Sequence, residues 1–211
     1  MLFETIVLDL DETIYPSSAG VMTAVKERIN DYMRQVTGLS DDEVEALRQH
    51  YLHQYGTSLR GLQANYQVDV EDFMAYVHDV QADKLLQPDP ELDAMLSRLP
   101  QRKIIFTNGS ADHAESVLRA LGIRHHFDTI LDVHDFDLEP KPADQAYDAL
   151  LRHLSHPPQQ ALYLDDRPEN LLPAMRRGLS VVLVAENGAT PPAGSARIRT
   201  VLELEKLLAE L

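Results

Sequence analysis

Five short apolar runs, separated by stretches of helical periodicity, constrain the fold of this chain more than any other feature. Thr5 to Leu10 is rich in Ile, Val and Leu without polar alternation, which is typical of a strand covered on both faces. Strands that alternate with helices indicate βαβ units, so we expect an α/β, Rossmann-like parallel sheet with helices on both faces. The other predicted strands are Lys103–Thr107, Asp128–Val133, Ala161–Asp165 and Ser180–Val184.

A helical block interrupts this alternation between the first two strands. One helical stripe stops at Gly38, and Ser40 with Glu43 three places on predicts a capping box that begins the next helix. Because the block lies between strands of one sheet, we expect an inserted α-helical subdomain rather than a separate domain. The expected division is residues 1–15 and 89–211 for the core and residues 16–88 for the insertion, whose last helix covers 69–86. The stretch 186–197 reads as a surface loop.

Charge and composition limit the partners of the chain. A formal net charge of −15 without a basic stripe argues against a nucleic-acid polymer or an anionic membrane as partner. The absence of cysteine excludes disulfides and thiolate zinc sites and fits a cytoplasmic protein. The N-terminus does not resemble a signal peptide, and no apolar run reaches the ~18 residues of a membrane helix. We expect a soluble, cytoplasmic monomer or homodimer whose partner is a small metabolite.

Unusual polar chemistry occurs at or just past strand ends in four places along the chain. Because ligands bind outside the carboxyl ends of the strands in open parallel sheets, these places are expected to converge on one crevice. Each motif alone has a plainer reading, as a helix cap, a turn or a solvated acid, and it is their order and position that favour function. They are Asp9, Asp11 and Thr13; Thr107, Asn108 and Gly109; Lys141; and Asp165 with Asp166.

The acids among these residues predict a magnesium site. Crowded carboxylates stay ionised together only if a cation compensates them. Asp9, Asp11, Asp165 and Asp166 are hard oxygen ligands without His or Cys partners, which suits Mg²⁺ better than zinc. Because Mg²⁺ usually binds few carboxylates together with substrate phosphate, the pattern indicates phosphoryl chemistry on a small phosphorylated metabolite.

The remaining polar residues match what phosphoryl transfer needs. The Thr107 hydroxyl and the Asn108 amide are candidate donors to phosphoryl oxygens, and Gly109 allows the backbone to approach closely. Lys141, between two prolines, brings a positive charge to the nucleophile.

The two acids after the first strand divide the reaction between them. Asp9 is the candidate nucleophile that forms an aspartyl-phosphate. Asp11 is the candidate acid that protonates the leaving oxygen and later activates water.

The four motifs "DLDET", "FTNGS", "KP" and "LDDRPEN", in this order, resemble those of the haloacid dehalogenase-like (HAD) hydrolase superfamily. The insertion resembles the α-helical C1 cap of that superfamily. Within it, "YGTSLRGL", "FMAYVHDV" and "IIFTNGSADHAESVLRALGI" are similar to the bacterial and fungal pyrimidine 5′-nucleotidase group. The resemblance implies a Mg²⁺-dependent phosphatase, with a pyrimidine nucleoside 5′-monophosphate as the expected substrate.

Carried over residue by residue, the resemblance implies that Asp9 is the nucleophile and a metal ligand. Asp11 would be the general acid and base and a ligand through its backbone carbonyl. Asp166 aligns with the direct metal ligand and Asp165 with a second acid that acts through water. The small or hydroxyl residue usual after this pair is replaced by Arg167, which leaves the local loop contacts open.

The same resemblance assigns the phosphoryl contacts. Thr107, with Asn108 beside it, would bind the phosphoryl group, and Lys141 would stabilise its charge. Asn170 is a candidate support for the acidic loop. The acid at Asp11 favours a phosphatase, because dehalogenases of the family lack a carboxylate there.

Three alternatives remain open at this point. They are a sugar-phosphate or phosphoglycolate-type phosphatase, a phosphomutase, and a non-catalytic regulatory binding protein. In the insertion Tyr51, Tyr55 and Arg60 are candidate nucleobase or sugar contacts, although tyrosines at helical spacing are more often packing residues. The pairs His50/His53 and His125/His126 lack a third ligand, so we expect exposed polar positions rather than metal sites.

Overall fold

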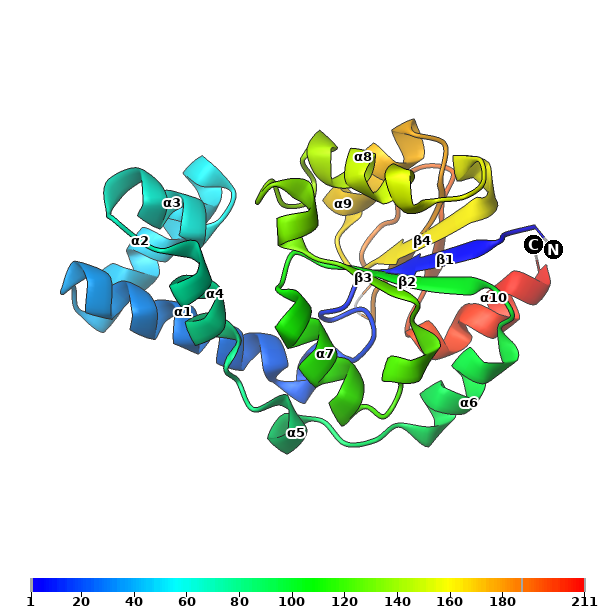
Figure 1. Cartoon of the computed structure of the whole chain (residues 1–211), viewed down its shortest axis with the longest axis horizontal. Coiled ribbons are helices and arrows are strands. Elements are labelled where there is room, and N and C mark those ends of the chain that lie inside the picture. The colour runs from blue at the N-terminus through cyan, green and yellow to red at the C-terminus, as the bar shows by residue number, and fades with distance from the viewer. Residues whose placement is uncertain (1, 187, 211) are drawn as a thin grey trace. The chain divides into compact units, whose positions relative to one another are not determined.

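The computed structural model describes residues 2–186 and 188–210, and in them the strands form a six-stranded sheet (Figure 1). The strand order is β3-β2-β1-β4-β5-β6, and every neighbouring pair is parallel. The α/β parallel sheet expected from the apolar runs is therefore confirmed. The strands are β1 Thr5–Leu8, β2 Arg102–Phe106, β3 Thr129–Leu131, β4 Ala161–Asp165, β5 Ser180–Val184 and β6 Ala196–Ile198.

Strand β6 corrects the expectation of a loop over residues 186–197. Ala196 and Ile198 pair with Val182 and Val184 of β5 in parallel register. Only Ile198 of the three residues in β6 is buried. A three-residue edge strand with one buried side chain has no apolar pattern of its own, because its pairing depends on the neighbouring strand.

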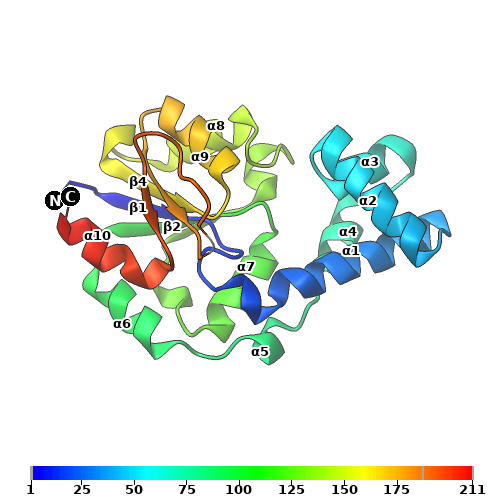
Figure 2. The same ribbon diagram turned by 180° about the vertical axis from the view of Figure 1, so that it is seen from behind.

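Helices cover both faces of the sheet. Figure 1 shows α8 and α9 on one face and α6, α7 and α10 on the other, and Figure 2 shows the same layers from behind. This double cover buries every residue of β1, which explains its continuous apolar run. The helices are α5 Ala82–Leu85, α6 Pro90–Arg98, α7 Ala111–Ala120, α8 Asp144–His153, α9 Pro168–Arg176 and α10 Leu204–Glu210. Short 3-10 helices are η1 Ser17–Ala19, η2 Arg124–His126, η3 Val133–Phe136, η4 Pro158–Gln160 and η5 Val201–Glu203.

The chain divides into two compact units. Met1–Ala19 and Ala82–Leu211 form the unit that contains the sheet, and Gly20–Gln81 forms a helical unit. The helical unit contains α1 Val21–Thr37, α2 Asp41–Tyr55, α3 Ser58–Asn65 and α4 Val70–His78. Its range lies inside the 16–88 expected for the insertion.

Two helix boundaries in this region show how local sequence sets the elements. Gly38, at φ 72°, ends α1, and the backbone amide of Ser40 donates to the Glu43 carboxylate at 2.9 Å at the start of α2. The single helix expected over 69–86 is wrong, because Gln81, at φ 51°, is left-handed and separates α4 from α5. Among the residues described, no helix has the length and apolar character needed to cross a membrane.

Candidate active site

Asp9 lies at the point where the strand order of the sheet reverses. It follows β1, which has β2 on one side and β4 on the other, and its backbone amide donates to the Leu164 carbonyl of β4 at 2.9 Å. Crevices at such a point are the usual ligand sites of parallel sheets. Asp9 is 7% exposed, and its two carboxylate oxygens accept from Lys141 Nζ at 2.7 Å and from the Thr13 hydroxyl at 2.9 Å.

Lys141 is the cation at the centre of the site. Its buried Nζ donates to Asp9 at 2.7 Å, to Asp165 at 3.0 Å and to the Phe106 carbonyl at 2.7 Å, and it lies 3.2 Å from the Tyr163 hydroxyl. Burial by itself would lower the pKa of Lys141, but Asp165 and Asp9 outweigh it and the pKa is raised. Lys141 is therefore charged, and it compensates one of the two carboxylates that it contacts.

Asn108 holds the backbone that carries this lysine. Its side-chain oxygen accepts from the Lys141 amide at 2.8 Å, and its side-chain nitrogen donates to the Lys141 carbonyl at 3.0 Å. The loop after β2 and the segment of Lys141 are thereby joined by two hydrogen bonds. The Asn108 side chain thus positions Lys141. The backbone amide of Asn108 is the group that it leaves available to a ligand.

Thr107, Gly109 and Ser110 turn the chain from β2 into α7. Thr107 is 1% exposed and its hydroxyl oxygen accepts from the amide of the buried Gly109 at 3.0 Å. The Ser110 hydroxyl accepts from the His113 amide at 3.3 Å and caps the helix. The amides of Gly109, Ala111 and His113 are already bonded within the protein. The Asn108 amide is therefore the backbone donor in this turn that suits a phosphoryl group.

Three carboxylates come together beside this turn. Oxygens of Asp9, Asp165 and Asp166 all lie within 4.8 Å of one another. We call them the acidic trio. Asp165 is fully buried, and its oxygens accept from Lys141, Tyr163, Asn170 and the Arg167 amide.

Asp166 differs from Asp165 in having no such donors. Within the described part of the chain no hydrogen bond or ion pair is made to its carboxylate. Burial, followed by the charges of Asp9 and Asp165, raises the pKa of Asp166 to about 8. Burial also raises the pKa of Asp9 to about 7, although Lys141 opposes the shift. One lysine therefore does not compensate the trio, and oxygen donors of this kind fit Mg²⁺.

Mg²⁺ should stabilise the protein more at pH ~8.5 than at pH ~6. The pKa values of about 7 for Asp9 and about 8 for Asp166 lie above the ~3.9 of an unfolded Asp. Without metal, each acid therefore destabilises the fold increasingly as pH rises from ~4 through its folded pKa. Mg²⁺ bound to the ionised acids would offset this loss only at the higher pH.

The measurement is the melting temperature with MgCl₂ and with EDTA across this pH range. Choline chloride at equal ionic strength controls for screening. An equal Mg²⁺ shift at both pH values would contradict the assignment of the ionised trio as the binding site.

Asp11 contacts two residues that the sequence motifs did not indicate. Its Oδ1 accepts from the Tyr15 hydroxyl at 2.5 Å and lies 2.8 Å from His113 Nε2. Burial would lower the pKa of His113, but the Asp11 carboxylate outweighs it and the pKa is raised. Tyr15 follows Asp11 by four residues and was a detectable signal, whereas His113, 102 residues away, was not.

The acidic loop accommodates Arg167 because its side chain pairs with Glu169. The guanidinium of Arg167 is bonded to Glu169, with Nε to Oε1 at 2.8 Å, and is largely exposed. Its backbone amide still donates to Asp165 at 2.9 Å. Asn170 donates to both Asp165 oxygens at 3.0 and 3.1 Å and so supports the loop as expected.

The residues chosen from the insertion belong to the helical unit. Tyr51 is a packing residue: it is 4% exposed, and a Cβ at Gly61 would lie 2.1 Å from its ring. Tyr55 is half-buried and packs edge-on against Tyr51 at 5.6 Å, and the Arg60 amide caps α3 by donating to Thr57. The substrate role expected of Tyr55 and Arg60 stays a prediction.

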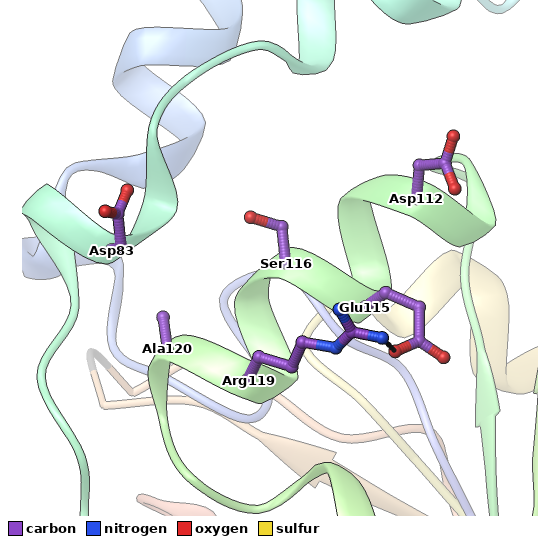
Figure 3. Close-up of a pocket in the computed structure, with 6 residues that line it drawn as sticks. All are labelled: Asp83, Asp112, Glu115, Ser116, Arg119 and Ala120. Carbon is purple, nitrogen blue, oxygen red and sulfur yellow. Dashed lines mark ion pairs between the residues drawn. The ribbon is translucent and has the colours of Figure 1, made fainter.

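Two hollows of the sheet-containing unit differ in their relation to this site. The hollow in Figure 3 lies along α7 and contains none of the candidate site residues. A second, of about 440 Å³, lies between residues 12–17 and 184–202 and is lined by Asp166 and Tyr15. Of these two hollows, the second is therefore the one lined by a member of the acidic trio, Asp166. The first is lined by Asp83, Asp112, Glu115, Ser116, Arg119 and Ala120.

Known hydrolases and phosphatases are similar to this chain in sequence. The model of the haloacid dehalogenase-like hydrolases matches residues 3–178. Phosphate metabolism protein 8 of Saccharomyces cerevisiae is 29% identical over 83% of the chain, which spans 59% of the length of that relative. Glyceraldehyde 3-phosphate phosphatase of Methanopyrus kandleri is 25% identical over 87% of the chain and 84% of its own length. Validoxylamine A 7′-phosphate phosphatase of Streptomyces hygroscopicus is 31% identical over 42% of the chain and 42% of its own length.

Solved structures share the fold at lower identity. An HAD phosphatase from Thermococcus onnurineus superimposes with a TM-score of 0.71 at 20% identity, covering 98% of both chains. The L-2-haloacid dehalogenase of Xanthobacter autotrophicus superimposes with a TM-score of 0.62 at 16% identity, covering 99% of both chains. Because phosphatases and dehalogenases both share this fold, the fold by itself does not separate the two activities.

Proposed function

Because the chain belongs to the haloacid dehalogenase-like hydrolases, we propose that it is a Mg²⁺-dependent phosphatase that hydrolyses a small phosphate monoester through an aspartyl-phosphate. The observation that carries the proposal is the buried Asp9 carboxylate, bonded to Lys141 at 2.7 Å and grouped with two further acids. Acids with a purely structural role at a strand end need neither a buried lysine nor a surplus of negative charge. A site that binds both a cation and a phosphoryl group needs the lysine for the phosphoryl oxygens and the surplus carboxylates for the cation.

The proposed reaction uses Asp9 as nucleophile. A carboxylate oxygen of Asp9 forms the bond to phosphorus while the bond from phosphorus to the ester oxygen breaks. Lys141 and the Asn108 amide stabilise the charge on the transferred oxygens. Water then cleaves the acyl phosphate and releases inorganic phosphate, so that Asp9 is restored.

Asp11 supplies the proton in the first step and removes one from water in the second. Tyr15 and His113 are positioning residues, because they hold the Asp11 carboxylate in one orientation. This acid is the observation that favours a phosphatase over a dehalogenase, since a halide leaves without a proton. The oxygens of Asp9 and Asp166 would hold Mg²⁺, and the Asp11 carbonyl is the further ligand that the resemblance implies. The bound ion would neutralise carboxylate charge and draw electron density from phosphorus.

The choice of Asp166 as direct metal ligand rests on its environment. Asp165 is occupied by Lys141, Tyr163, Asn170 and a backbone amide. Asp166 has a raised pKa and, among the described residues, no donor, so a cation is the group that would stabilise its ionised form.

For the substrate we propose a pyrimidine nucleoside 5′-monophosphate, on the similarity of the stretch from Tyr55 to Leu62 to nucleotidases of that class. The second candidate is a sugar phosphate, because two relatives are phosphatases of glyceraldehyde 3-phosphate and validoxylamine A 7′-phosphate. The test is kcat/KM for UMP, CMP, AMP, sugar phosphates and phosphoglycolate with Mg²⁺. Equal values across these classes would contradict the nucleotide proposal, and isomerised phosphate in place of free phosphate would indicate a mutase.

Variants of the helical unit sharpen this test. If Tyr55 and Arg60 contact the nucleoside, Tyr55→Ala and Arg60→Ala raise KM for UMP and leave hydrolysis of a generic aryl phosphate unchanged. Tyr66→Ala is the matched control, because Tyr66 is an exposed tyrosine of the same unit. An equal effect of the variants on both substrates would remove these residues from substrate recognition.

A further inference from the structure

Asp93, His125 and His126 form a cluster that the phosphatase site does not use. Asp93 lies on α6, and the two histidines form the end of η2. Asp93 Oδ1 is 2.7 Å from His126 Nε2 and 3.2 Å from His125 Nε2. The imidazole rings are neighbours, with centroids 4.0 Å apart. The Nε2 atoms of both rings therefore face the same carboxylate oxygen, as the two distances show. Asp93 is therefore the third candidate donor that the sequence did not show for this histidine pair.

We propose that Asp93, His125 and His126 bind a divalent transition-metal ion of the Zn²⁺ class. Two imidazole nitrogens and one carboxylate oxygen are ligands of Zn²⁺, Co²⁺ and Ni²⁺, whereas Mg²⁺ prefers oxygen alone. The cluster is thus chemically distinct from the acidic trio, in which all three donors are carboxylates.

The spacing of the donor atoms fits such an ion with little movement. Zn²⁺ lies about 2.0–2.2 Å from His nitrogen and carboxylate oxygen, so tetrahedral ligands are about 3.3 Å apart. The two measured separations from Asp93, 2.7 and 3.2 Å, lie near this value, and all three donor atoms lie within 4.8 Å. An ion would replace the hydrogens now shared by these atoms, and it would keep a coordination position open to water.

The backbone that carries the ligands is anchored. Leu92, beside Asp93, is 1% exposed, and Ile123 and Phe127, which flank the histidine pair, are 0% and 3% exposed. The His126 side chain is itself 8% exposed, while that of His125 is 64% exposed. One histidine is thus fixed and the other is open to solvent, which allows an ion to enter without unfolding.

The cluster also lies at a different place in the fold from the acidic trio. Helix η2 ends at His126 and β3 begins at Thr129, so the pair stands at the amino end of a strand. The acidic trio stands after the carboxyl ends of β1 and β4. A bound ion would join α6 to η2 and would take no part in the chemistry at Asp9.

The test is a titration of the whole protein with Zn²⁺, followed by calorimetry, in the presence of excess Mg²⁺ to occupy the acidic trio. We expect one Zn²⁺ equivalent, and an affinity reduced about tenfold or more by His125→Ala or Asp93→Asn. The double variant His125→Ala/His126→Ala should lose the site. In a parallel NMR titration, Co²⁺ should shift the imidazole signals of His125 and His126 and no other histidine pair.

The matched control is His50→Ala/His53→Ala, which removes two exposed histidines of α2 and should leave Zn²⁺ binding unchanged. Unchanged affinity in His125→Ala and Asp93→Asn overturns the proposal, and so does Co²⁺ shifting only the other histidines. Because His125 is exposed, its variant retains the fold even if His126→Ala does not. Phosphatase activity is not the readout, so failure here and failure of the proposed function are separate results.

Discussion

Asp9→Asn should abolish phosphate release, with kcat/KM falling about 10⁴-fold or more, because the amide cannot form an aspartyl-phosphate. Asn has nearly the shape of Asp, and its oxygen still accepts a hydrogen bond from Lys141, so the fold should persist. The measurement is Mg²⁺-dependent release of phosphate from an aryl phosphate, with circular dichroism to confirm folding.

Asp112→Asn is the control for this variant, because Asp112 is an exposed acid at the start of α7. It should retain wild-type activity. Activity of Asp9→Asn within tenfold of wild type would exclude nucleophilic catalysis by Asp9 and, with it, the proposed mechanism. Trapping a Mg²⁺-dependent fluoroberyllate complex on wild type, and not on the variant, would support it independently.

Lys141→Met should both inactivate and destabilise the protein. The variant leaves the buried Asp9 and Asp165 without their cation, which should lower the free energy of unfolding by about 3–5 kcal/mol. Loss of the charge near the transferred phosphoryl group should lower kcat by about 10²–10³-fold. Urea unfolding and phosphate release measure the two effects.

The stability loss in Lys141→Met should shrink as pH falls. Lys141 opposes the rise in the pKa of Asp9, so its removal raises the pKa of Asp9 further above about 7. Below that pKa the acid takes up a proton and no longer needs the cation, so the loss is largest at pH ~8 and smallest near pH ~5.5.

Lys103→Met is the matched control for these effects. Lys103 is also a buried lysine, but its Nζ donates to the carbonyls of Leu99 and Gln101 at 2.6 and 3.1 Å. Its removal should destabilise the protein without affecting kcat and without this dependence on pH. The same pH dependence in both variants would mean that the carboxylates do not cause the loss at Lys141.

Several features of the fold follow from local sequence. The apolar runs predicted β1, β2, β4 and β5, because strands covered on both faces must be apolar throughout. Ser40 and Glu43 predicted the start of α2, because a capping box is made by neighbours in the chain. Strand β6 was not predicted, because an edge strand is stabilised by its partner rather than by its own pattern.

In the candidate site, too, some features follow from local sequence and others depend on tertiary contacts. Asp9, Asp165 and Asp166 stand at strand ends in the sequence, and parallel strands place their carboxyl ends at one edge, so a cluster of acids was predictable. The resemblance distinguished Asp166 from Asp165, but the physical cause was not predictable, because it depends on donors from Lys141 and Asn170 to Asp165.

By itself, the sequence determined the type of sheet, the place of the acids and the family, because these depend on periodicity and on the order of motifs. Only the tertiary structure decided which two acids Lys141 contacts, which residues hold Asp11, and that Asp93 faces His125 and His126. Hydrogen bonds and ion pairs between residues 32 to 132 positions apart have no local signature. They form only when packing of the helices against the sheet brings those side chains together.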